Sequence, residues 1–229
     1  MKILALETSA KSVSCAVTED GAVLASAYQC TGLTHSRTLM PMVEDLLKNA
    51  ELTLSDIDRI AIAAGPGSFT GLRIGIAAVK GLAWAADKPC CAVSTLEAMA
   101  QNVRHMDALI IGAMDARRNQ IYNALFEAKD GTLTRLCDDR AIGLDELCTE
   151  LNGDDRRKSV LGVGGRLCFD YLISHGIGCT LAPAQLLYQN AVGVALAAEH
   201  SAAMTAQELS PVYLRPAQAE RLRMEKECK

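Results

Sequence analysis

The strongest constraint on the fold of this chain is an internal duplication. Residues 2–6 form an apolar run that ends in Glu7, and two more strand-like runs follow, at 13–17 and 23–28, joined by an Asp-Gly turn. The same order returns in the second half, where an apolar run ends in Asp115 before two runs that flank another Asp-Gly turn. Asp-Gly between strand-like runs is a strong hairpin signal. The sequence therefore predicts two halves that each open with a three-stranded meander.

Helices follow the three strands in each half. Apolar residues at i, i+3, i+4 and i+7 spacing carry the helix assignments. In the first half we predict helices over 37–50, 70–86 and 96–103, and a strand over 59–64. In the second half we predict strands over 108–114, 120–126, 132–136 and 159–163, and helices over 144–151, 166–175 and 190–203. This repeated βββαβα order predicts an α/β fold with two lobes and a cleft between them.

A glycine-rich stretch over 65–75 joins the strand at 59–64 to the longest helix. The free N–H groups at a helix start favour an anion, which makes a phosphate cradle one interpretation. No Gly-Lys-Ser/Thr follows, so the stretch is not a Walker A loop. The other interpretation is a turn that launches a closely packing helix. Gly71 and Gly75 lie on one helix face, and small residues at this spacing allow another helix to approach.

Composition limits the classes of function. The net charge is −4, and the densest basic clusters are interleaved with acids, so tight nucleic-acid binding by this chain alone is not expected. No segment approaches the roughly 18 apolar residues that span a bilayer. The first residues turn acidic too soon for a signal peptide. We therefore expect a cytoplasmic protein without a membrane association.

Metal ligands are not indicated by the cysteines or histidines. The nine cysteines include no Cys-x-x-Cys pair, and the four histidines lie far apart in the sequence. Scattered cysteines in such a chain are typical of reduced, mostly buried thiols. Glu7 and Asp115, which end the first strand of each half, are the acidic candidates. They could hold a magnesium-bound phosphate at the cleft, or serve only as strand-end caps.

Several segments resemble one family over nearly the whole chain. They are 3–9, 65–75, 93–100, 114–118 and 211–215, together with His35 and the Leu-Met-Pro at 39–41. The duplicated pattern resembles the actin-like ATPase (ASKHA, RNase H-like) superfamily, and within it the chain is similar to the bacterial TsaB (YeaZ) family, paralogues of TsaD. The resemblance implies an amino-terminal actin-like lobe over 1–104, a second lobe over 105–205, and a tail over 206–229 that packs back on the lobes.

This resemblance implies a role in making threonylcarbamoyladenosine beside the anticodon of tRNAs that read codons starting with A. In that pathway TsaD transfers threonylcarbamoyl from threonylcarbamoyl-adenylate to the tRNA. TsaB binds and activates TsaD, the ATPase TsaE joins them, and TsaB itself is not an enzyme. The chain would meet tRNA only through the complex, and it would form a homodimer when alone.

Two departures from the relatives bear on chemistry. TsaD relatives carry a His-x-x-x-His metal pair where this chain has Thr95 and Met99, which cannot replace two imidazoles on a metal ion. No catalytic residue and no metal are therefore expected, which disfavours a metalloprotease. Actin-like ATPases place Asp where this chain has Glu7. The resemblance therefore implies at most weak binding of ATP or ADP, and an active ATPase or kinase is the alternative class of function. The candidate nucleotide-binding residues are Glu7, Thr8, Gly162 and Gly164.

The resemblance to this family implies that the amino-terminal lobe is the docking surface for TsaD. We expect the helices over 37–50 and 70–86 to form most of it, through Leu39, Met42, Val43, Gly71, Arg73, Gly75, Ala77, Lys80 and Trp84. Trp and Arg are enriched at binding hot spots. The only tryptophan could instead pack in the lobe's core, and the sequence leaves both readings open. His35 matches a family position and is expected only to cap or contact the first helix.

Overall fold

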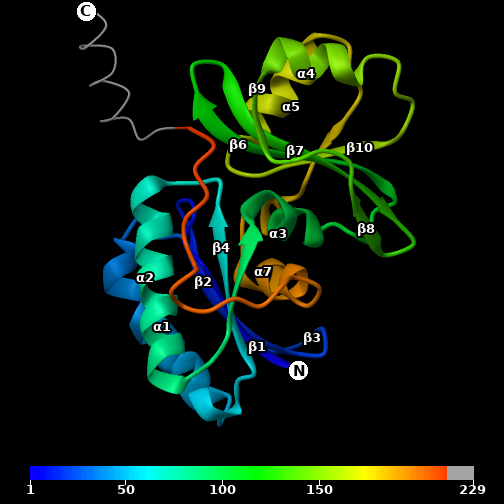
Figure 1. Cartoon of the computed structure of the whole chain (residues 1–229). Helices are drawn as coiled ribbons and strands as arrows, with labels where there is room; N and C mark the ends of the chain where they lie inside the picture. Colours follow the sequence, from blue (N-terminus) through cyan, green and yellow to red (C-terminus); the bar gives the residue numbers. More distant parts are fainter. Residues whose placement is uncertain (216–229) are drawn as a thin grey trace, which may run out of the picture.

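The computed structural model describes residues 1–215 as two β-sheets with helices between and outside them (Figure 1). The first half contains β1 (Lys2–Glu7), β2 (Val13–Glu19), β3 (Ala22–Gln29), α1 (His35–Asn49), the short 3-10 helix η1 (Leu54–Asp56), β4 (Arg59–Gly65), α2 (Phe69–Ala86), β5 (Cys90–Ser94) and α3 (Thr95–Gln101). The second half contains β6 (Ala108–Arg117), β7 (Gln120–Lys129), β8 (Thr132–Arg135), β9 (Arg140–Gly143), α4 (Leu144–Leu151), β10 (Lys158–Leu161), α5 (Gly165–Ser174), β11 (Thr180–Leu181), α6 (Ala184–Leu187) and α7 (Ala191–Ala198).

The sheet topology confirms the duplication. The first sheet runs in the order β3-β2-β1-β4-β5, and the second runs β8-β7-β6-β10-β11, with β9 added beside β7. Strand β1 pairs antiparallel with β2 and parallel with β4, and β6 likewise pairs antiparallel with β7 and parallel with β10. The two sheets therefore repeat one βββαβα unit, and the carboxyl ends of β1 and β6 hold equivalent places.

The helices form three layers around the two sheets (Figure 1). Helices α1 and α2 cover the outer face of the first sheet, and α4 and α5 cover the outer face of the second. Helices α3 and α7 pack against each other between the sheets. The first half's α3 belongs to a core cluster with β6 and β7, while the second half's α7 belongs to one with β1 and β4. The two halves thus exchange a helix; the domain boundaries at 104 and 205 stay a prediction.

Small side chains allow the middle layer to pack closely. Helix α7 consists mostly of alanine and valine. The first sheet packs against it with four alanines: Ala5, Ala16, Ala61 and Ala63. On the other side of α7, a Cβ on Gly193 would lie 2.0 Å from the carbonyl oxygen of Ala98 in α3. Because interiors pack as densely as organic crystals, these alanines and this glycine set the spacing between the two halves.

The elements that the sequence missed are short. Strand β5 contains the adjacent, fully buried Cys90 and Cys91 and shows no period-2 alternation. Strand β9 has four residues, β11 has two and α6 has four, so their local signals are weak. Helix α7 ends at Ala198, before the predicted end at residue 203. Residues 211–215 form neither helix nor strand, and the tail beyond them lies outside the described residues.

Candidate functional site

A cleft of about 630 Å³ lies where the two sheets meet the glycine turn and the end of the described chain. Its walls are residues 9–11 after β1, 66–69 before and at the start of α2, 114–117 at the end of β6, and 212–215. Lys11, Arg117 and Arg215 bring positive charge to this lining, and Asp115 brings negative charge. The cleft expected between the lobes is therefore present, and its lining combines charged, polar and apolar residues.

The two strand-end carboxylates differ in their surroundings. Asp115 lines the cleft and is exposed, whereas Glu7 is fully buried and is not part of the lining. Glu7 Oε1 accepts a hydrogen bond from the backbone N–H of Ser9 at 2.5 Å, and Asp115 Oδ1 accepts one from Arg117 N at 2.7 Å. Both carboxylates thus cap their strand ends, and the expected pair facing the cleft is not formed.

Burial changes the chemistry of Glu7. Removal from water raises the pKa of its carboxyl to about 7, while hydrogen bonding from the Ser9 backbone acts in the opposite direction. Its Oε2 has no hydrogen-bond partner in the described structure. A buried carboxylate with an unpartnered oxygen is costly, so the neutral form is favoured at mildly acidic pH. A nucleotide contact through Glu7 stays a prediction.

The glycines of α2 serve a close contact inside the chain. A Cβ on Gly71 would lie 2.1 Å from the carbonyl oxygen of Thr8, and one on Gly75 would lie 2.2 Å from Thr8 Oγ1. The Thr8 hydroxyl donates a hydrogen bond to the carbonyl oxygen of Gly71 at 2.8 Å. The interpretation of 65–75 as a close-packing turn agrees with this geometry. However, the approaching group is the end of β1 and not another helix, and both glycines are buried.

The second half repeats this arrangement at Gly162 and Gly164, which follow β10. A Cβ on Gly162 would lie 2.1 Å from the carbonyl oxygen of Ala113, and one on Gly164 would lie 2.6 Å from the backbone nitrogen of Asp115. Gly164 N also donates to Ala113 O at 3.0 Å. In each lobe, then, a glycine turn packs on the end of the first strand. Whether Thr8, Gly162 or Gly164 also contacts a nucleotide stays a prediction.

The outer face of α2 carries the exposed members of the predicted docking set. Trp84 is 73% exposed, so it does not pack in the core of the lobe. Arg73 and Ala77 are also exposed, and Lys80 is half-buried, with its Nζ 3.4 Å from the carbonyl oxygen of Gln207. Sequence reasoning missed Gly81, which is exposed and whose Cβ would meet nothing within 4 Å. Its spacing of four from Ala77 was the available signal.

Helix α1 presents different residues from those predicted. Leu39 and Val43 are 1% and 2% exposed and belong to the core under the first sheet, and Met42 is partly buried against that core. The exposed apolar residue is Met40, at 42%. His35, the first residue of α1, donates from Nε2 to the carbonyl oxygen of Ala10 at 2.7 Å, which agrees with its expected contact near that helix. Leu39 and Val43 have the period of an amphipathic helix, and that period marks the core side.

A C-terminal strap, which we define as residues 211–215, runs from α2 to the β6–β7 hairpin (Figure 1). Val212 N donates to the carbonyl oxygen of Ala64 at 2.8 Å. The ring of Tyr213 stacks on that of Phe69 with centroids 5.0 Å apart. Arg215 donates to the carbonyl oxygen of Ala116 at 3.2 Å and also contacts Gln120 Oε1. The strap therefore touches both lobes.

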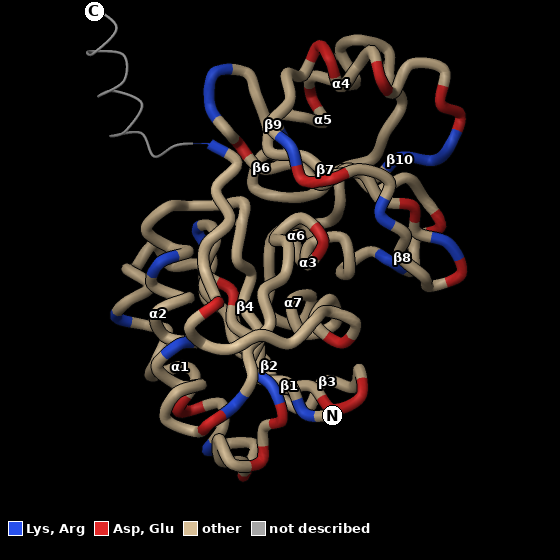
Figure 2. Tube along the Cα trace, in the orientation of Figure 1, with Lys and Arg blue, Asp and Glu red and all other residues tan. Residues whose placement is uncertain are grey.

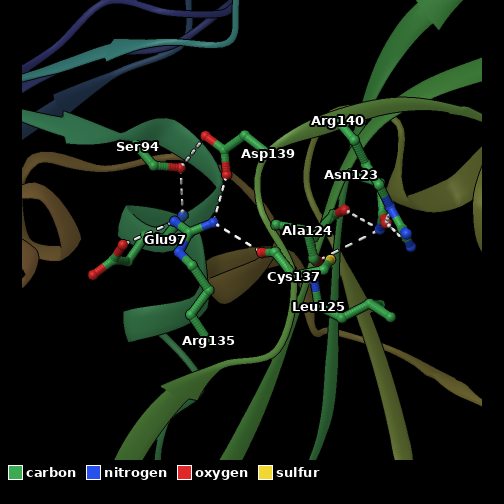
Figure 3. A network of polar contacts seen from close by, with 10 residues as sticks. Ser94, Glu97, Asn123, Ala124, Leu125, Arg135, Cys137, Asp139 and Arg140 are labelled. Carbon is green, nitrogen blue, oxygen red and sulfur yellow. Dashed lines mark hydrogen bonds and ion pairs between the residues drawn. The ribbon is translucent and has the colours of Figure 1, made fainter.

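A polar network joins the two halves at α3 (Figure 3). Arg135, at the end of β8, pairs with Glu97 of α3 at 2.8 Å and with Asp139 at 2.7 Å. Asp139 also accepts a hydrogen bond from the hydroxyl of Ser94 at 2.6 Å, and that hydroxyl caps α3 by accepting from Glu97 N. The Arg135 guanidinium lies 4.7 Å from the centre of the Phe126 ring. These contacts fix the helix exchanged between the halves.

Replacing Arg135 with alanine is expected to lower the free energy of unfolding by about 2 kcal/mol, because Glu97 and Asp139 lose their cation in a partly buried site. Arg135→Lys should recover part of this loss, since lysine restores the charge without the planar fork. Urea unfolding followed by circular dichroism measures both. A change below about 0.5 kcal/mol for Arg135→Ala, the range of ordinary surface substitutions, would show that the network contributes little.

Charge elsewhere is mixed. In the view of Figure 2, Lys and Arg segments alternate with Asp and Glu segments over both lobes, and no broad basic face is visible.

Within residues 1–215, no three His, Cys, Asp or Glu side chains gather as they would around a metal ion. Thr95 and Met99 are both fully buried in α3. None of the helices in that range is long and apolar enough to cross a membrane.

The repeated sheet order, the exchanged helices and the cleft define a two-lobed protein of the actin-like (ASKHA) class. Comparison with known proteins identifies the family within this class. The family model of TsaD, tRNA N6-adenosine threonylcarbamoyltransferase, matches residues 29–222. The tRNA threonylcarbamoyladenosine biosynthesis protein TsaB of Bacillus subtilis (strain 168) is 39% identical over 162 residues, which are 71% of this chain and 71% of that protein.

Two further relatives extend over more of the chain. TsaB of Haemophilus influenzae (strain ATCC 51907 / DSM 11121 / KW20 / Rd) is 29% identical over 226 residues, 94% of each protein. The solved structure of YeaZ from Pseudomonas aeruginosa is 29% identical and superposes with a TM-score of 0.77 over 93% of this chain and 99% of that one. This chain belongs to the TsaB (YeaZ) family, whose curated members are named for tRNA threonylcarbamoyladenosine biosynthesis.

Proposed function

We propose that this chain is a non-catalytic subunit of the complex that makes threonylcarbamoyladenosine in tRNA. It binds and activates TsaD, which transfers threonylcarbamoyl from threonylcarbamoyl-adenylate to the adenosine beside the anticodon. TsaE joins the two subunits, and tRNA is reached only through the complex. The role requires no cofactor in this chain, although the cleft leaves room for weak binding of ATP or ADP. It acts in the cytoplasm.

The observation that carries this proposal is the outer face of α2. A tryptophan that is 73% exposed costs free energy in water, and such residues are enriched where partners bind. Between Arg73 and Trp84 this face carries the exposed small residues Ala77 and Gly81, which allow a helix of the partner to approach closely. An apolar anchor, a cation and a small-residue surface on one rigid helix are suited to docking a protein.

The same face is also self-complementary. In an antiparallel pair of α2 helices centred between Ala78 and Val79, Arg73 would lie against Trp84 of a second copy, and Ala77 against its Lys80. A guanidinium over an indole ring is a favourable cation–π contact. A homodimer is therefore the expected state of the chain without TsaD, and binding of TsaD would displace the second copy.

Trp84→Ala tests the docking face. We expect it to weaken the affinity for TsaD at least about 30-fold, because truncating a hot-spot aromatic costs about 2 kcal/mol or more. The matched control is Leu167→Ala, which removes another exposed apolar side chain (42%) from α5 on the second lobe. Calorimetric titration of TsaD with each variant gives the affinity, and circular dichroism checks the fold. Equal affinity for Trp84→Ala and the control would place the interface elsewhere.

Depletion of the protein in its own organism tests the pathway. The expected result is loss of threonylcarbamoyladenosine from tRNA, restored by the wild-type chain and by Leu167→Ala but not by Trp84→Ala. Unchanged levels of the modified base after depletion would contradict the role. Calorimetry of the isolated chain with ATP and magnesium separates the alternative class: tight binding with turnover would identify an actin-like ATPase.

A further inference from the structure

The strap places an aromatic side chain against the docking helix. Tyr213 is 140 positions from Arg73 in the sequence, yet its hydroxyl oxygen accepts a hydrogen bond from Arg73 Nε at 3.1 Å. Its ring stacks on Phe69, the first residue of α2, with an interplanar angle of 25°. The Arg73 guanidinium lies 3.8 Å from the centre of the same Phe69 ring. Three side chains from two distant segments therefore hold one another on the surface.

The strap itself is fixed in place. A Cβ on Gly65 would lie 2.2 Å from the carbonyl oxygen of Val212, so the strap backbone is seated where only glycine leaves room. The backbone N–H of the same residue, Val212, donates a hydrogen bond to the carbonyl oxygen of Ala64. Arg215 anchors the far end on the second lobe. The strap backbone is therefore fixed on both sides of Tyr213, whose side chain contacts α2.

Within residues 1–215, the outer N–H donors of Arg73 have no partner. Its Nε is used by Tyr213, and its Nη1 and Nη2 groups make no hydrogen bond or ion pair within the described residues. Arginine normally loses much rotamer freedom when it is fixed in a complex, and fixing it beforehand removes that cost from binding. The remaining pair of N–H donors matches a carboxylate, which accepts two parallel hydrogen bonds.

We propose that Tyr213 is a positioning residue of the docking face, which holds Arg73 on Phe69 so that its outer N–H groups meet a carboxylate of the partner. This inference rests on the proposed function, because it assumes that TsaD docks on α2. It also specifies the surface of the partner: an Asp or Glu must lie about 16 Å, three helical turns, from the apolar site that receives Trp84. The docking face is then built from α2 and the strap together.

A double-mutant cycle with TsaD tests this role. Tyr213→Phe removes the hydroxyl oxygen and keeps the stacked ring, so it should disturb only the bond to Arg73. We expect Arg73→Ala to weaken the affinity about tenfold to 100-fold, and Tyr213→Phe about threefold to tenfold. In the Arg73→Ala background, Tyr213→Phe should have no further effect. The affinity of the wild type should also fall more steeply with salt than that of Arg73→Ala.

The outcomes separate the two ideas. Additive effects of Arg73→Ala and Tyr213→Phe on the affinity for TsaD would overturn the positioning role, as would an unchanged affinity for Tyr213→Phe. If Trp84→Ala still weakens binding in either case, the proposed docking face stands and only the inference fails. If Trp84→Ala has no effect, the docking face itself is wrong. Unfolding curves of each variant confirm that the strap remains folded, and Tyr213→Phe is expected to match the wild type.

Discussion

Replacing Gly71 with alanine is expected to destabilise the protein by about 3 kcal/mol or more, at the upper end of overpacking substitutions. The new Cβ would lie 2.1 Å from the carbonyl oxygen of Thr8 and 3.3 Å from its carbonyl carbon. These are backbone atoms just after the central strand β1, so they cannot move without disturbing the sheet. Any shift of α2 that relieves this contact would also stretch the hydrogen bond from the Thr8 hydroxyl to the carbonyl oxygen of residue 71. Alanine's better helix propensity, about 1 kcal/mol, does not offset this clash.

Gly81→Ala is the matched control in the same helix. A Cβ there meets no atom within 4 Å, and the residue is exposed. It should therefore stabilise the protein by about 0.5–1 kcal/mol through helix propensity and the unfolded chain's lost freedom. Urea unfolding measures both variants. A Gly71→Ala protein within about 1 kcal/mol of the wild type would mean that α2 can move away from Thr8 at little cost.

Replacing Glu7 with glutamine is expected to remove a pH dependence of stability. The Glu7 pKa is 4.5 in an unfolded reference and about 7 in the fold, because burial disfavours the charged form. Between these values the unfolded chain releases the proton and the folded chain retains it. The free energy of unfolding of the wild type therefore falls as pH rises from 4.5 to 7, by about 3 kcal/mol, and changes no further above 7.

Glutamine keeps the shape of the neutral acid, and its Oε1 can still accept from Ser9 N. Relative to the wild type, Glu7→Gln should gain about 3 kcal/mol of stability between pH 4 and pH 8. Asp115→Asn is the control, since that carboxylate holds the same strand-end place in the second lobe but is exposed. Denaturant unfolding at several pH values compares the three proteins. Parallel curves for the wild type and Glu7→Gln would contradict the buried, proton-retaining carboxyl.

The fold could largely be predicted from the sequence, because its signals are local. The run at β1, the Asp-Gly turns and the helical period of α2 each depend on neighbouring residues, and each repeats in the second half. The candidate site was harder. Leu39 and Val43 were predicted at the docking surface, but their helical period also fits the core, and the core is where they lie. A period shows that a helix has two faces and does not show which one is outside.

The sequence by itself determined the duplication, the two-lobed α/β architecture and the family, since periodicity and motifs survive without knowledge of contacts. Only the tertiary structure decided that Gly71 packs against Thr8 while Trp84 faces solvent. Only the tertiary structure also shows that Tyr213 contacts Arg73 and that α3 and α7 each pack in the core of the other half. The physical reason is that burial, close approach and pKa depend on what the rest of the chain places nearby, and those neighbours are distant in sequence.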